Sequence, residues 1–133
     1  MTRTIIIIPS RMSATRLKGK PLLEINNKPI ISHVFDRARQ TGLEVVVATE
    51  NIEIVNAVEK NGGKAILTKH HNTGTDRVFE AFNKLKMSSI EYVLNLQGDE
   101  PMINPEDITN LNKLMIKNKL DMGTLASEIK EKN

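Results

Sequence analysis

The segment TIIII, residues 4–8, runs directly into the polar segment PSRMSATRLKGK, residues 9–20, and this junction decides the fold. A threonine followed by four isoleucines is a short β-branched apolar run, which is typical of a strand buried inside a sheet. Pro9 and the charged residues behind it end the run. The pattern therefore predicts a buried strand with a long polar loop at its carboxyl end.

The rest of the chain alternates between helical and strand patterns. Helices are predicted over residues 30–41, 51–61 and 76–85 and from Asn104 past Met115, and strands over 45–48, 64–67, 92–96 and 122–127. Asn51 is the predicted cap of the second helix, and Thr75 or Asp76 that of the third. Strands separated by helices of this length imply βαβ units. The predicted fold class is α/β, a Rossmann-like, mostly parallel sheet with helices on both faces.

Composition and charge exclude several classes of protein. The 133 residues fit one compact domain, residues 1–133, and the absence of Cys excludes disulfides and thiolate metal sites. A net charge of +3 with one Tyr, three Phe and no Trp argues against nucleic-acid binding. Residues 5–8 are too short an apolar stretch for a signal peptide, and no stretch approaches the ~20 residues of a membrane helix. We expect a cytoplasmic protein that binds neither nucleic acid nor membrane.

The polar loop after the first strand is a candidate anion site. Parallel sheets bind ligands at the carboxyl ends of their strands, and no acid precedes Glu24. Arginine and lysine neutralise phosphate charge, while hydroxyls and amides donate hydrogen bonds. The loop matches neither the dinucleotide fingerprint nor the Walker A pattern. A triphosphate site and a solvated basic loop therefore both stay open. The polar side chains in question are Ser10, Arg11, Arg16, Lys18 and Lys20.

A second polar cluster, QGDEP at residues 97–101, follows the strand predicted over 92–96. Two carboxylates at the end of a buried strand suit a hard cation such as Mg²⁺. The amide of Gln97 has both a donor and an acceptor, so it can recognise a base edge. The alternative is an acidic turn that caps the segment behind it.

The third cluster, residues 70–77, contains two adjacent histidines. Neighbouring histidines rarely bind one metal together, and no third ligand stands at a matching spacing, so a metal role is disfavoured. Gly74 and Thr75 instead predict a loop and helix start whose backbone approaches a ligand. Arg77 either adds a cation to that ligand site or lies on the helix surface.

Taken together, the three clusters resemble the motifs of the CMP-Kdo synthetases, the 3-deoxy-manno-octulosonate cytidylyltransferases. Residues 7–22, IIPSRMSATRLKGKPL, resemble the opening signature of that family. GTDR at 74–77 resembles its second motif and NLQGDEPMI at 95–103 its third. The match spans essentially the whole chain, in the family's order.

This resemblance implies a fold of the nucleotide-diphospho-sugar transferase type and a defined reaction. Cytidylyl would pass from CTP to Kdo (3-deoxy-D-manno-octulosonate), giving CMP-Kdo and pyrophosphate for lipopolysaccharide synthesis. The resemblance assigns catalysis to Arg11, Lys20 and Asp99, with Asp99 as the ligand of the cofactor Mg²⁺. The residues that it assigns to CTP binding are Ser10, Arg11, Arg16, Lys20, Gly74, Thr75, Arg77 and Gln97.

Members of that family are much longer than this chain. We expect the C-terminal half to be missing, and with it a second acidic metal ligand, much of the Kdo pocket and the contacts of the family's homodimer. The alternatives to a working enzyme are a catalytically incomplete CTP-binding fragment and a cytidylyltransferase for another acidic sugar.

Overall fold

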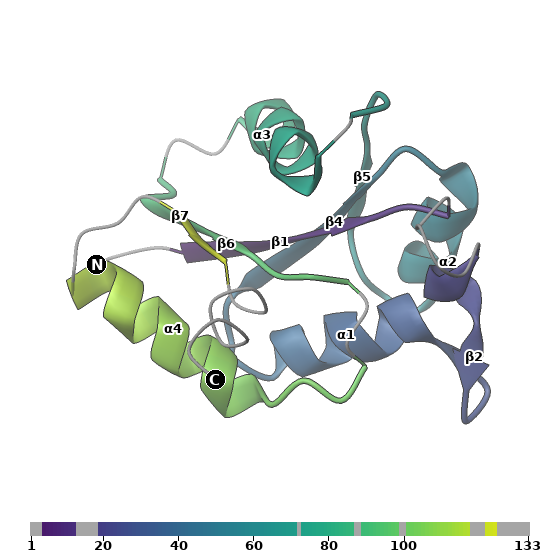
Figure 1. Ribbon diagram of the computed structural model, residues 1–133, viewed down its shortest axis with the longest axis horizontal. Helices are drawn as coiled ribbons and strands as arrows, with labels where there is room; N and C mark the ends of the chain where they lie inside the picture. The colour runs from purple at the N-terminus through teal and green to yellow at the C-terminus, as the bar shows by residue number, and fades with distance from the viewer. Residues whose placement is uncertain are drawn as a thin grey trace.

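The computed structural model describes residues 4–12, 19–71, 73–86, 89–98 and 101–117, and the backbone of 122–124. These residues contain a parallel sheet with strand order β5-β4-β1-β6-β7 (Figure 1). Its strands are β1 (Thr4–Ser10), β4 (Glu44–Thr49), β5 (Ala65–Leu67), β6 (Tyr92–Asn95) and β7 (Met122–Thr124). The α/β fold class predicted from the sequence is confirmed.

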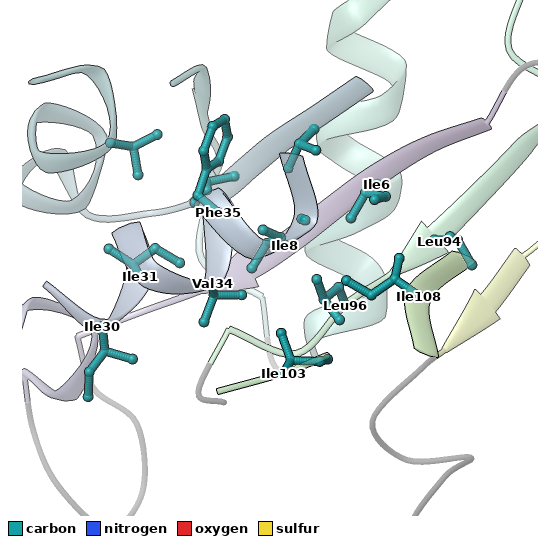
Figure 2. Close-up of a cluster of buried hydrophobic side chains, with 14 of the residues drawn as sticks. Ile6, Ile8, Ile30, Ile31, Val34, Phe35, Leu94, Leu96, Ile103 and Ile108 are labelled. Atoms are coloured by element: carbon teal, nitrogen blue, oxygen red, sulfur yellow. The ribbon is translucent and has the colours of Figure 1, made fainter. Parts of the chain in front are cut away.

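Strand β1 is the centre of the sheet, and its isoleucines divide between the two faces. Residues 5–8 are fully buried, because β4 and β6 flank the strand and helices cover both faces of the sheet. Ile6 and Ile8 belong to the larger apolar cluster, which Figure 2 shows together with side chains of the covering helices. Ile5 and Ile7 belong to a smaller cluster on the opposite face. The alternation is the two-residue period of a strand buried on both sides.

Helices cover both faces of this sheet. The larger cluster takes apolar residues from α1 (Ile30–Arg39), α2 (Ile52–Lys60) and α4 (Pro105–Lys117). The smaller cluster takes them from α3 (Gly74–Leu85). In Figure 1, α1 and α4 lie below the sheet and α3 above it. The four helices predicted from apolar spacing are therefore present, with shifted ends.

One predicted helix cap differs from the structure, and a second is confirmed in position but makes no capping bond. Helix α3 begins at Gly74, and its N-cap is Thr73, whose hydroxyl accepts a hydrogen bond from the Asp76 amide at 3.1 Å. The prediction of Thr75 or Asp76 as the cap was wrong, because both residues already lie within the first helical turn. Asn51 does occupy the N-cap of α2, but its side chain makes no capping bond and contacts another loop instead.

A small hairpin between β1 and α1 was not predicted. It pairs β2 (Glu24–Ile25) with β3 (Lys28–Pro29) and follows a 3₁₀ turn, η1 (Lys20–Leu22). Asn26 and Asn27 form its turn with φ of 53° and 65°, a backbone that asparagine tolerates better than most residues. Strands of two residues are too short to show periodicity. The hairpin connects the polar loop after β1 to the start of α1.

Candidate functional site

A pocket of about 220 Å³ lies where β1 and β6 end and α3 begins. Its walls come from three segments that are far apart in the sequence but meet at one edge of the sheet. This is the edge at which open parallel sheets bind ligands. The lining residues are Pro9, Ser10, Arg11, Lys20, Pro21, Gly74, Arg77, Gln97 and Gly98.

The pocket brings together most of the site residues predicted from the sequence. Thr75 is not among the lining residues and is exposed in the first turn of α3. Arg16 and Asp99 lie outside the described residues. The predicted residues that line the pocket are Ser10, Arg11, Lys20, Gly74, Arg77 and Gln97.

Pro9 lines the pocket, and two glycines pack against it. A Cβ added at Gly98 would lie 3.1 Å from the Pro9 carbonyl oxygen and 3.2 Å from Ile8 Cγ2. A Cβ added at Gly74 would lie 3.3 Å from Pro9 Cγ. Glycine at both positions therefore lets the loop after β6 and the start of α3 approach the end of β1 closely.

Arg77 is a buried cation in the wall of this pocket. Its side chain is only 3% exposed, and its Nη2 donates to Glu50 Oε1 at 2.8 Å. The pKa of the guanidinium lies below its ordinary value, because burial and nearby Arg11 lower it more than Glu50 raises it. An arginine stays charged at neutral pH under such conditions. Arg77 is therefore a fixed positive charge held inside the protein.

Two buried polar atoms of pocket residues lack a hydrogen-bond partner within the described part of the chain. They are Nε of Arg77 and Oγ of Ser10. Buried polar groups are normally paired, since leaving one unpaired costs ~1–3 kcal/mol. Both atoms can donate a hydrogen bond, so the pocket suits a ligand that carries acceptor oxygens.

The charges of the pocket favour an anion. Arg11, Lys20 and Arg77 line it, whereas no carboxylate belongs to its described lining. Gly74 adds the amino-terminal end of the 12-residue helix α3, whose dipole favours negative charge. Cations, orphan donors and a helix start together fit a phosphorylated ligand.

The two histidines of the third cluster face glutamates. His70 Nδ1 lies 3.0 Å from Glu50 Oε2, and His71 Nε2 lies 2.6 Å from Glu80 Oε1. The described ranges, with their gaps, contain no group of three His, Cys, Asp or Glu residues that could hold a metal ion. The predicted Mg²⁺ ligand, Asp99, lies outside those ranges, so magnesium stays a prediction.

Sequence reasoning missed Glu50, which holds Arg77 although it does not line the pocket. Glu50 and Asn51 directly follow β4, which pairs with β1, so they leave the sheet at the same edge as the pocket loops. Its position at the end of β4 was the only feature of the sequence that could have pointed to Glu50.

The described residues contain no helix long and apolar enough to cross a membrane.

Comparisons with known proteins agree with this geometry. The family model described as Cytidylyltransferase matches residues 5–133. A 3-deoxy-manno-octulosonate cytidylyltransferase of Nitrobacter hamburgensis is 48% identical over 131 residues, which cover 96% of this chain and 51% of that protein. The protein of the same name from Thermodesulfovibrio yellowstonii is 45% identical, over 98% of this chain and 54% of its own length.

Solved structures show the same fold. The structure of a CMP:2-keto-3-deoxy-manno-octonic acid synthetase complexed with CTP matches with a TM-score of 0.82 and 44% identity, covering 90% of this chain and 49% of that one. A cytidylyltransferase from Leptospira borgpetersenii matches in fold, with a TM-score of 0.77 at 24% identity. The chain spans about half the length of the curated relatives that it matches. By this family match over nearly all of its residues, the chain belongs to the cytidylyltransferase family.

Proposed function

We propose that this chain provides the CTP-binding half of a cytidylyltransferase that acts on Kdo and forms CMP-Kdo and pyrophosphate. The observation that carries the proposal is the pocket at the carboxyl edge of the sheet. Three cations line it, two of its lining residues carry buried donors without a partner among the described residues, and no carboxylate belongs to its described lining. The relatives named for this reaction, and the similar structure in complex with CTP, support the same ligand.

The proposed reaction is a displacement at phosphorus. The anomeric hydroxyl oxygen of Kdo forms a bond to the α-phosphorus of CTP and releases its proton to solvent, while the bond to the bridging oxygen breaks and pyrophosphate leaves with the electron pair. Enzymes accelerate such transfers mainly by positioning the reactants and neutralising charge. Arg11, Lys20 and Arg77 would offset the charge of the triphosphate and of the departing pyrophosphate. Gln97 would recognise the cytosine through its amide.

Magnesium belongs to the proposal through the family resemblance, which assigns it to Asp99. Gln97 and Gly98, the two residues before Asp99, line the pocket. The described lining offers Mg²⁺ no carboxylate, so any ligand set must come from residues outside it. When bound, the ion would polarise a phosphate oxygen. A cytoplasmic location, expected from the sequence pattern, and a homodimer, implied by the resemblance, also remain proposals.

A second candidate function is nucleotide binding without catalysis. The described lining of the pocket comes from residues 9–98, and its cations suit a nucleotide's phosphates. The chain spans only about half the length of the relatives named for transfer to Kdo. Transfer to another acidic sugar is the third possibility.

A pyrophosphate-release assay with CTP, Mg²⁺ and Kdo separates these functions, with Asp99→Ala as the inactive control. Release that needs all three components and disappears in the control would establish the transferase. CTP binding by calorimetry without release would establish a nucleotide-binding unit, and release with a different acidic sugar would reassign the acceptor. A cooperatively folded chain that binds no CTP would overturn the proposal.

A further inference from the structure

The junction between β4 and α2 contacts two different walls of the pocket without lining it. Glu50 Oε1 accepts a hydrogen bond from Arg77 Nη2 at 2.8 Å, which links the junction to α3. The next residue, Asn51, accepts one from the Met12 amide through Oδ1 at 2.9 Å, which links it to the loop after β1. Two consecutive side chains thus join the segments that supply the pocket's cations.

The backbone of this junction is itself well held. Thr49 is fully buried, and its hydroxyl accepts from the Asn51 amide at 3.1 Å. The Thr49 carbonyl accepts from Thr68 at 2.7 Å, and the Asn51 carbonyl accepts from Ile54 and Val55 of α2. Glu50 and Asn51 therefore project from a fixed point of the sheet edge.

Glu50 determines how the buried guanidinium of Arg77 is oriented. A guanidinium is a rigid planar fork, so fixing one of its nitrogens also directs the others. With Nη2 bound to Glu50, the Nε of this pocket-lining arginine is buried and lacks a partner among the described residues. Glu50 also provides the counter-charge that a cation with a 3% exposed side chain requires.

Asn51 acts on the other cationic wall. Besides donating to Asn51, Met12 accepts a hydrogen bond from the Gly19 amide through its carbonyl oxygen at 2.7 Å. Arg11 precedes Met12, and Lys20 follows Gly19. One asparagine contact therefore anchors the backbone beside both of these pocket cations.

We propose that Glu50 and Asn51 are positioning residues, which hold the cations of the two pocket walls in place before the nucleotide arrives. Neither touches the ligand. Their effect is preorganisation, which strengthens binding because the protein does not have to order these side chains during association. The inference rests on the proposed function, in which the triphosphate of CTP is the bound anion.

The test compares Glu50→Gln with Glu53→Gln, a control that removes the same charge from an exposed residue in the first turn of α2. We expect Glu50→Gln to weaken CTP binding roughly tenfold, which is typical of a lost charge-assisted contact. Tripolyphosphate should lose affinity by the same factor, and the ratio of CTP to UTP affinity should not change. Glu50→Asp should recover part of the loss.

A double-mutant cycle distinguishes positioning from general damage. If Glu50 acts through Arg77, then Glu50→Gln should have little further effect on affinity once Arg77→Met is present. Asn51→Ala should weaken binding separately and add to Arg77→Met, because it acts on the other wall. Thermal melts show whether each variant is folded. If Glu50→Gln does not fold, Glu50→Asp and Asn51→Ala replace it in the binding measurements.

Unchanged or tighter CTP binding by folded Glu50→Gln and Asn51→Ala would overturn the inference and leave the proposed function intact. Additive effects of Glu50→Gln and Arg77→Met would also overturn it. If the wild-type chain bound tripolyphosphate but not CTP, the proposed function would fail. The positioning role would then still be decided by the same variants with tripolyphosphate as the probe.

Discussion

Helices α1 and α3 lie on opposite faces of the same sheet and bury different kinds of side chain. Helix α1 buries an almost wholly apolar stripe that includes Ile31, Val34 and Phe35. Helix α3 buries only two apolar residues, Val78 and Ala81, together with the charged Arg77. The first helix is a core element, whereas the second contributes a cation to the pocket. Stability and ligand binding should therefore depend on different faces of the sheet.

The strongest test of this comparison is a matched pair of phenylalanines. Phe35 on α1 is buried, whereas Phe79 on α3 is 52% exposed. We expect Phe35→Ala to lower the free energy of unfolding by about 3–5 kcal/mol, because it leaves a cavity in the larger cluster. Phe79→Ala should lower it by less than about 1 kcal/mol. Urea denaturation measures both, and equal losses would remove the distinction between the faces.

A matched pair of arginines tests the other half of the comparison. Arg77→Met should weaken CTP binding by about 10–100-fold, as expected for the loss of one or two charge-assisted hydrogen bonds. Arg39 on α1 is exposed over the Phe35 ring, 5.4 Å from its centroid, so Arg39→Met should leave the affinity unchanged. Isothermal titration calorimetry measures both, and a similar affinity for all three proteins would show that Arg77 is only structural.

A smaller effect should separate the shape of the pocket from its charge. Gly98→Ala places a methyl group 3.1 Å from the Pro9 carbonyl oxygen, and the loop must shift to admit it. We expect a cost of about 1–3 kcal/mol in stability, by overpacking, and several-fold weaker CTP binding. Gly74→Ala, whose added methyl meets only the Pro9 ring, is the milder control. Calorimetry measures the affinity and thermal melts the stability. A larger loss for Gly74→Ala than for Gly98→Ala would contradict the expectation.

The smallest expected effect is a pH dependence that belongs to α3. Lys84 binds Glu80 at 2.8 Å, and with His71 and the Lys69 amide it lowers the pKa of Glu80 from 4.5 to about 2. Because the folded-state pKa is depressed, this stabilisation is present above pH 4.5 and is lost as the pH falls toward 2.

Glu80→Gln should therefore flatten the dependence of stability on pH within that window, because it lowers stability near pH 6–7, where the stabilisation is fully present, and has little effect near pH 2. Urea denaturation at pH 3 and at pH 6 measures the difference. Glu59→Gln, which removes an exposed carboxylate from α2, is the control. Identical pH slopes for wild type and Glu80→Gln would contradict the expectation.

Much of the fold follows from apolar spacing. The isoleucines of β1 and the amphipathic stripes of the helices predict the elements, and the carboxyl-edge rule predicts that loops after β1 and β6 meet the start of α3. The pairing of Glu50 with Arg77 was not predictable in this way. Such a contact joins residues that are 27 positions apart, and it depends on where α3 packs on the sheet. No local sequence pattern predicts that position.

The hairpin and the exact cap of α3 were missed for a more local reason. Strands of two residues are too short to show an alternating pattern in the sequence. Near Gly74, three hydroxyl or acidic residues are all suitable caps by side-chain type. Which of these residues becomes the cap depends on which side chain can reach an unpaired backbone amide in the first turn of the helix. Side-chain type alone does not decide it.

The contact of Pro9 with Gly74 and Gly98 limits how the pocket can be redesigned. A side chain at Gly98 meets the Pro9 backbone and one at Gly74 meets the Pro9 ring, so both positions leave little room for change. An engineer who wants a different base accepted must work at the rim, where Gln97 and Lys20 have side chains to exchange. A library directed at the rim should therefore retain folded members, whereas one directed at the glycines should lose them.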